Sequence, residues 1–163
     1  MTIRLIANLG PNGELGYNGK TIYNNPLDFQ LFKLVTCVDR AVVIAGRKTA
    51  ESMKHVSSNG RDFRYVSYSQ TSAIGKHKQW KHIDDLEIFL NSDKTHIEEQ
   101  VYIIGGARLF EEAQQFAEEA IIMHDDKFSY WPCDTYWNVS EYFRRDDTLF
   151  KVGSLTATRW IRR

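Results

Sequence analysis

Two segments of this chain share one pattern, in which a run of aliphatic residues ends at glycine beside arginine and a helical pattern follows. The first is residues 41–49, Ala-Val-Val-Ile-Ala-Gly-Arg-Lys-Thr, and the second is residues 101–108, Val-Tyr-Ile-Ile-Gly-Gly-Ala-Arg. Short apolar runs bounded by turn residues are typical of buried strands. Strands that alternate with helices predict an α/β domain.

The remaining chain continues this alternation. Further strands are expected at residues 3–9, 63–69 and 120–124, and helices at residues 26–36, 83–90 and about 107–117. The helix at 26–36 has Asn25 as its expected N-cap and Pro26 at its first position.

Residues 13–24 are rich in glycine and asparagine and predict a long loop, a feature that is often functional. Residues 141–151 and 154–161 predict a C-terminal hairpin around Gly153. Because no linker divides the chain, we expect a single domain over residues 1–163.

Composition excludes several classes of protein. A hydrophobic fraction of 42% and a formal net charge of zero argue against intrinsic disorder and against the basic field of a nucleic-acid binder. Two cysteines make neither a disulfide framework nor a zinc site, and they favour a reducing compartment. No apolar run approaches the roughly 20 residues of a membrane span, and the first residues resemble a strand more than a secretory leader. We therefore expect a cytoplasmic protein that binds neither nucleic acid nor membranes.

Glycine beside arginine at a strand-to-helix junction suits a phosphate group. Glycine lets an anion approach the backbone, the helix N-terminus presents N–H groups, and arginine adds charge. In open α/β sheets such ligands lie at the carboxyl ends of strands. A tight turn that merely needs glycine explains either junction equally well, and neither matches the P-loop or the G-x-G-x-x-G pattern.

Asp28 and Phe32 lie four residues apart and share one face of the expected helix. An acid in the first turn commonly only stabilises its helix, by roughly 0.3–1 kcal/mol. The alternative is a buried anion that faces a cationic or amidine-like ligand beside an apolar wall, and spacing alone favours the first interpretation. The five histidines show no metal-ligand spacing, so no metal site is expected.

Taken in order, a series of motifs resembles the dihydrofolate reductase family from Ile3 to about Trp137. The motifs are Leu5-Ile6-Ala7, Leu15-Gly16, residues 24–28 with Phe32 and Lys33, residues 43–53, Gly60-Arg61, residues 103–110 and Asp134-Thr135. The resemblance implies a mostly parallel, eight-stranded twisted sheet flanked by helices, with a C-terminal antiparallel hairpin. It also implies that NADPH gives a hydride to C6 of dihydrofolate while N5 takes a proton from solvent.

The resemblance also implies a substrate site. Asp28 would be the catalytic acid that accepts hydrogen bonds from the pterin's 2-amino group and N3, and its field would favour protonation at N5. Phe32 would pack on the pterin and benzoyl rings, and Arg61 would pair with the α-carboxylate of the glutamate tail. The other residues implied to line this cleft are Ile6, Ala7, Met53 and Ile104.

A cofactor site follows from the same resemblance. Arg47, with Lys48, would meet the 2′-phosphate of NADPH, and Gly105 and Gly106 would let the pyrophosphate approach. The loop at residues 10–24 would form a lid over the nicotinamide. The full set of implied cofactor residues is Ala7, Leu15, Gly16, Gly46, Arg47, Lys48, Thr49, Ser67, Tyr68, Gly105, Gly106, Ala107, Arg108 and Leu109.

The sequence departs from the family pattern in four places. The lid carries Ile22-Tyr23 in place of Pro-Trp, and we expect the Tyr23 hydroxyl to hold a catalytic water near the pterin. Met123 stands where a threonine hydroxyl usually bonds the acid, so the pKa of Asp28 is expected to lie above that of its relatives. Phe110 replaces a tyrosine near the nicotinamide. Asn8 replaces a small apolar residue and is expected to alter antifolate contacts.

Two other functions stay open. One is a reductase of the same fold that acts on a riboflavin-precursor pyrimidine, although such a substrate does not need Arg61 to clamp a glutamate carboxylate. The other is a weakly active or non-catalytic binding or structural homologue, for example in a viral particle, which Ile22, Phe110 and Met123 leave possible. The expected partners are dihydrofolate and antifolate inhibitors, and the expected state is a monomer. The four departures are compatible with weak trimethoprim binding but do not predict it.

Overall fold

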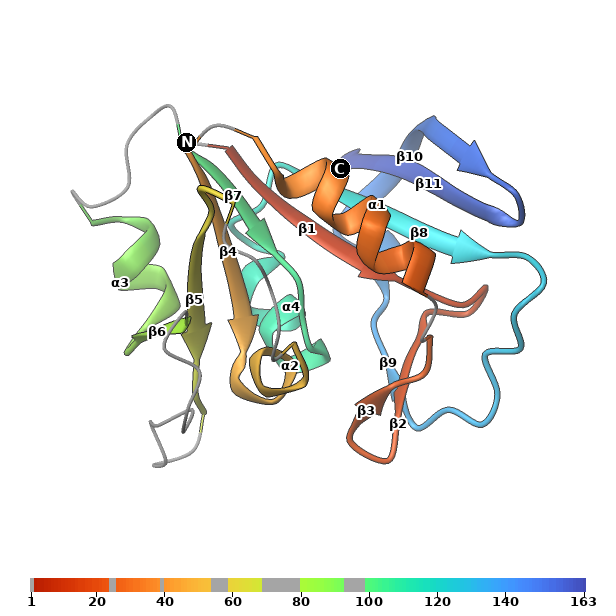
Figure 1. The fold of residues 1–163 in the computed structure, drawn as a ribbon, viewed down its shortest axis with the longest axis horizontal. Helices are drawn as coiled ribbons and strands as arrows, with labels where there is room; N and C mark the ends of the chain where they lie inside the picture. Colours follow the sequence, from red (N-terminus) through yellow and green to blue (C-terminus); the bar gives the residue numbers. More distant parts are fainter. Residues whose placement is uncertain (1, 24–25, 39, 54–58, 69–79, 93–98) are drawn as a thin grey trace.

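The computed structural model describes residues 2–23, 26–38, 40–53, 59–68, 80–92 and 99–163. Eight strands form one sheet in the order β10-β11-β8-β1-β7-β4-β5-β6 (Figure 1). These strands are β1 (Thr2–Asn8), β4 (Ala41–Gly46), β5 (Asp62–Val66), β6 (Trp80–Ile83), β7 (Gln100–Ile103), β8 (Glu119–Asp125), β10 (Phe143–Val152) and β11 (Leu155–Arg162). Neighbouring strands from β8 to β6 are parallel, and β11 is antiparallel to both β8 and β10. The expected α/β fold, with a mostly parallel sheet and a C-terminal hairpin, is confirmed.

Different helices cover the two faces of the sheet. Side chains alternate along the inner strands, so successive strand residues pack against different helices. Leu5 of β1 belongs to one buried cluster, together with Leu109 of α4. Its neighbour Ile6 belongs to the other cluster, together with Phe32 of α1. The helices are α1 (Pro26–Thr36), α2 (Arg47–Ser52), α3 (Leu86–Leu90) and α4 (Ala107–Ala113), with a short 3₁₀ turn η1 (Val139–Glu141). Asp28, on α1, therefore lies on the same side of the sheet as Ile6.

A second sheet, in the order β3-β2-β9, overturns the prediction of a structureless loop over residues 13–24. Its strands are β2 (Glu14–Tyr17), β3 (Lys20–Thr21) and β9 (Thr135–Tyr136). Asn18 and Gly19 turn the chain between β2 and β3 with φ values of 53° and 78°. Both values are positive, as a type I′ hairpin turn requires, and Asn-Gly is the usual sequence signal for that turn. The signal was present in the sequence, but the many glycines around it favoured a loop.

Three other element boundaries differ from the prediction. The helix expected at residues 83–90 is preceded by β6 and begins only after Asp85, whose side chain accepts a hydrogen bond from the N–H of Ile88 at 2.9 Å. The helix expected to reach about residue 117 ends at Ala113, where buried Gln114 accepts a hydrogen bond from Trp137. The strand expected over residues 63–69 ends at Val66. Asn25, the expected N-cap of α1, lies outside the described residues.

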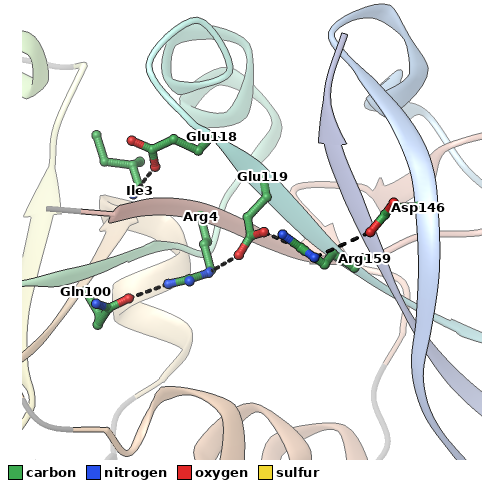
Figure 2. Close-up of polar contacts among 7 residues, drawn as sticks. All are labelled: Ile3, Arg4, Gln100, Glu118, Glu119, Asp146 and Arg159. Carbon is green, nitrogen blue, oxygen red and sulfur yellow. Dashed lines mark hydrogen bonds and ion pairs between the residues drawn. The ribbon is translucent and has the colours of Figure 1, made fainter.

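A row of charged side chains links the starts of the parallel strands to the hairpin (Figure 2). Arg4 of β1 donates hydrogen bonds to Gln100 and Glu119, and Glu119 also accepts one from Arg159 of β11 at 2.7 Å. Arg159 reaches Asp146 of β10 at 3.4 Å. Burial alone would raise the pKa of Glu119, but the hydrogen bonds from Arg159 and Arg4 outweigh it and lower the pKa. This row joins strands β7, β1, β8, β11 and β10 near the amino ends of the parallel strands.

Candidate functional site

The two glycine junctions lie side by side at the carboxyl ends of β4 and β7. These strands are parallel neighbours, with Val42 opposite Val101 and Ile44 opposite Ile103. The N–H of Gly46 donates to the carbonyl of Gly105 at 2.7 Å, so the junctions are joined directly. In open α/β sheets, this edge is the place where ligands bind.

A cavity of about 410 Å³ opens beside the two junctions. Every residue that the resemblance assigned to the cofactor lines this cavity, except Ala7 and Gly105, and the cavity is hereafter called the cofactor cavity. The lining residues that were not predicted are Gly19, Lys20, Thr21, Val66 and Thr135. Three of these five belong to the β2–β3 hairpin, so recognising its Asn-Gly turn would have placed them there.

The junctions offer backbone groups suited to an anion. Gly46 and Gly106 are the N-cap residues of helices α2 and α4, and neither has a side chain that caps its helix. The first N–H groups of such a helix remain for a ligand. A Cβ added at Gly106 meets only Thr49 Oγ1, at 3.9 Å, so a side chain there would extend into space beside a cavity-lining residue. Glycine at 106 thus keeps the approach to the backbone open.

Cationic and aromatic side chains complete the rim of the cofactor cavity. Arg47 Nη1 contacts Glu51 Oε1 at 3.0 Å, one turn along α2. The guanidinium of Arg108 lies 4.1 Å from the ring centre of Tyr68. Burial, together with a hydrogen bond to Glu112, raises the pKa of Tyr68 well above its usual range. Tyr68 is therefore a neutral platform on which Arg108 is held by a cation–π contact.

Asp28 lies in the first turn of α1 and is half-buried. Burial raises its pKa, and a hydrogen bond from Asn8 opposes that shift. Asn8 Nδ2 donates to Asp28 Oδ1 at 3.2 Å. Met123, which lacks a donor, is 2% exposed on β8. A pKa of Asp28 above that of its relatives stays a prediction, because this shift is from the ordinary value of the carboxyl and its main cause is burial. The role of Asn8 as a donor to Asp28 was not predicted, because the sequence placed it only near antifolates.

The residues expected around the substrate are largely brought together. Ile6, Phe32 and Met53 are buried in one cluster, and Ile104 packs against it. Ala7 is buried in the cluster on the other face of the sheet. Its Cβ therefore points away from the side of α1, so only its backbone is left to face that side.

Arg61 is buried beside the same cluster, with 5% of the residue exposed. Its Nη1 donates to Thr36 Oγ1 at 2.6 Å, and its guanidinium lies over the rings of Phe63 and Phe32, at 4.9 and 5.8 Å. Desolvation lowers its pKa. Arg61 therefore lies next to Phe32, as it must if both side chains contact the same substrate. It also packs on the rings of Phe32 and Phe63.

Tyr23 lies in the buried cluster, and its hydroxyl donates to Asp125 Oδ2 at 2.9 Å. Its ring contacts Phe128 edge-on and stacks near Tyr130, with centroid distances of 4.9 and 6.1 Å. The structure thus places the Tyr23 hydroxyl against Asp125, and its expected role in holding a water stays a prediction.

Phe110 lies next to the second glycine junction. The ring of Phe110 is buried beneath Gly105 and stacks on Trp137 at 4.6 Å.

Within the described ranges, no cluster of His, Cys, Asp and Glu is suited to a metal ion. Among the helices that the structure describes, none is both long and apolar enough to cross a membrane.

Comparisons with known proteins bear on the family and the fold of the chain. The family model described as dihydrofolate reductase matches residues 2–146. A bifunctional dihydrofolate reductase-thymidylate synthase from Paramecium tetraurelia is 31% identical over 159 residues, which cover 97% of this chain and 32% of that protein. The chain thus spans about a third of the length of this curated relative. A dihydrofolate reductase from Enterococcus faecalis, solved with NADP(H) and RAB-propyl, has a TM-score of 0.76, covering 99% of this chain and 96% of that chain. At 16% identity, this last likeness shows the fold alone.

Proposed function

The chain belongs to the dihydrofolate reductase family, and on that basis we propose that it reduces 7,8-dihydrofolate to tetrahydrofolate with NADPH. The observation that carries the proposal is the pairing of a half-buried acid, Asp28, with a cavity at the two glycine junctions. The acid suits the cationic form of a pterin, and the cavity suits a phosphate-bearing cofactor.

The residues present fit a dinucleotide phosphate. Uncapped helix starts at Gly46 and Gly106 would receive the pyrophosphate, and Arg108 would add charge at the rim. Arg47 and Lys48 would meet the 2′-phosphate, which distinguishes NADPH from NADH. When bound, this cofactor supplies the hydride, and the protein supplies position and electrostatics.

Asp28 would orient the pterin by accepting hydrogen bonds from its 2-amino group and N3. Its negative charge, in a partly desolvated site, favours positive charge on the pterin and so makes protonation at N5 by solvent easier. Phe32 would form an apolar wall, and Arg61, in contact with Phe32, would pair with the α-carboxylate of the glutamate tail. Tyr23 would accept a hydrogen bond from an ordered water.

We further propose one domain over residues 1–163, acting as a cytoplasmic monomer that also binds antifolates. One sheet contains strands from Thr2 to Arg162, which supports a single domain. Cys37 and Cys133 are free thiols, which supports a reducing compartment.

The test is oxidation of NADPH in the presence of dihydrofolate, followed by absorbance, with parent and Asp28→Asn proteins side by side. We expect turnover by the parent and a loss of roughly 100- to 1,000-fold in kcat/KM for Asp28→Asn, with NADPH affinity unchanged. Asp84→Asn is the matched control, because its side chain is 98% exposed near β6, at the far edge of the sheet. A parent protein that binds NADPH but shows no turnover would instead favour a non-catalytic homologue.

A further inference from the structure

We propose that Asn8 and Tyr130 act as a positioning pair, in which Tyr130 fixes the amide of Asn8 so that its N–H group aligns the carboxylate of Asp28. Neither residue is assigned a role by the similarity to known proteins. This inference rests on the proposed function, because it concerns the acid that would bind the pterin.

The hydrogen bonds of Tyr130 leave only one orientation for the Asn8 amide. The backbone N–H of Asp125 donates to the Tyr130 hydroxyl at 3.1 Å, and that hydroxyl donates to Asn8 Oδ1 at 2.5 Å. Since Oδ1 accepts from Tyr130, Nδ2 is the part of the amide that faces Asp28, where it donates at 3.2 Å. The three residues form a directed chain that ends on the carboxylate.

Tyr130 is buried among aromatic rings and keeps its proton. It is 6% exposed, and its ring contacts those of Phe128, His124 and Tyr23, at centroid distances of 5.0, 5.3 and 6.1 Å. Burial is the largest cause that raises the pKa of Tyr130 above its usual range. The hydrogen bond from the Asp125 N–H opposes this shift, and the nearby charges of Tyr23, Asp125 and Asp28 reinforce it. A tyrosine with a raised pKa remains a donor at any pH at which the enzyme works.

Asn8 occupies the place from which a donor is needed. It lies at the end of β1 opposite Met123 of β8, and Met123 has no hydrogen to donate. Asn8 follows Ile6 by two positions and so lies on the same face of the sheet as α1. The titratable groups that contact the pair are Asp28, Tyr23 and His124, together with Asp125, whose backbone N–H bonds Tyr130. The carboxylate of Glu14 lies with the ring of Tyr130 beside Gly10.

The direction of the change in the pKa of Asp28 follows from which form of the carboxyl the hydrogen bond favours. A donor to a carboxylate favours the anion, so removing Asn8 Nδ2 raises the pKa of Asp28 further above its ordinary value. The acidic limb of the kcat/KM profile, which requires ionised Asp28, then moves to higher pH.

The test uses Asn8→Leu, which keeps the approximate size and loses the amide, and Tyr130→Phe, which keeps the ring and loses the hydroxyl. Tyr142→Phe is the matched control, because Tyr142 lies beside η1 and β10. The pKa of Asp28 is measured by carboxyl-carbon NMR without ligand, with the resonance assigned from Asp28→Asn. Melting temperatures establish that each variant is folded.

We expect the pKa of Asp28 to rise by about one unit in Asn8→Leu and by less in Tyr130→Phe, with no change in Tyr142→Phe. In the Asn8→Leu background, adding Tyr130→Phe should change nothing more, because Tyr130 acts through Asn8. The acidic limb of kcat/KM should shift by the same amounts, and kcat at neutral pH should fall about 5- to 10-fold in Asn8→Leu.

An unchanged pKa in folded Asn8→Leu would overturn the pair, even with full turnover in the parent. A further rise on adding Tyr130→Phe to Asn8→Leu would also overturn it, because Tyr130 would then act on Asp28 directly. Failure of the proposed function has a different signature, since the NMR titration needs no turnover and a silent parent enzyme would still report the pKa shifts.

Discussion

The cofactor cavity and the cluster of side chains around Asp28 are built by different means. The cavity is shaped by strand ends, two glycine junctions and the starts of two helices. The Asp28 cluster is held by hydrogen bonds between side chains, among which Asn8 and Tyr130 come from distant parts of the chain. A backbone-built site follows from a local sequence pattern, whereas a side-chain-built site depends on which residues the fold brings together.

The two regions also differ in the charge that they present. The cavity presents the cations Arg47, Lys48 and Arg108 near its opening, where solvent moderates their interactions. The Asp28 cluster contains a carboxylate whose pKa is raised by burial. Changes in this cluster should therefore affect chemistry and its pH dependence, and changes in the cavity should affect cofactor affinity.

The largest effect in this comparison is expected at Arg61, on the substrate side. Arg61→Leu removes a charge-assisted contact with the glutamate tail, so KM for dihydrofolate should rise roughly 10- to 100-fold. A pteridine without that tail should lose no more than about 3-fold, and NADPH affinity should not change.

Arg61→Lys sharpens this prediction, because lysine keeps the charge but loses the forked geometry. The tail-less pteridine also corrects for damage to packing, since Arg61 donates to Thr36 and lies over Phe63. Equal losses for both substrates would assign Arg61 to packing alone.

A smaller effect is expected from Gly105→Ala, on the cofactor side. Gly105 has a φ of 110°, and an added Cβ would lie 3.2 Å from the ring of Phe110. The unfavourable backbone and the crowded ring should cost about 1–3 kcal/mol of stability, measured by urea denaturation. NADPH affinity should fall about tenfold, because Gly105 accepts the hydrogen bond that joins it to Gly46.

Gly153→Ala is the control for that change. Gly153 also has a positive φ, 61°, but an added Cβ there meets no atom within 4 Å. Gly153→Ala should therefore lose only the roughly 1–2 kcal/mol of stability that the unfavourable backbone conformation costs, and NADPH affinity should not change. If the two alanine variants lose equal stability and bind NADPH equally, contact with Phe110 is not important at the junction.

The contrast between the regions also explains what the sequence could predict. The junctions at Gly46 and Gly106 were identified because glycine, arginine and the preceding aliphatic run are adjacent in the chain. The β2–β3 hairpin was missed although Asn18-Gly19 is a local signal for it. Tyr130 carried no local signal at all, because its bond to Asn8 joins positions that only the folded sheet brings together. Such long-range side-chain pairs are not encoded by periodicity or turn residues.

The smallest change in affinity is expected at the ion pair between Arg47, which lines the cavity, and Glu51. Unlike the glycine junctions, this part of the cavity is made by side chains. The pair is partly exposed, with 27% and 41% of the side chains accessible, and such pairs contribute about 0.2–1 kcal/mol. In the proposed NADPH complex, Glu51 would compete with the 2′-phosphate for Arg47, so Glu51→Gln should tighten NADPH binding about two- to threefold at low salt. The gain should shrink as ionic strength rises, and it should be absent for NADH, which lacks that phosphate. Glu87→Gln, an exposed acid on α3, should change neither affinity. Weaker NADPH binding in Glu51→Gln would show the opposite relation, in which Glu51 holds Arg47 in position for the phosphate.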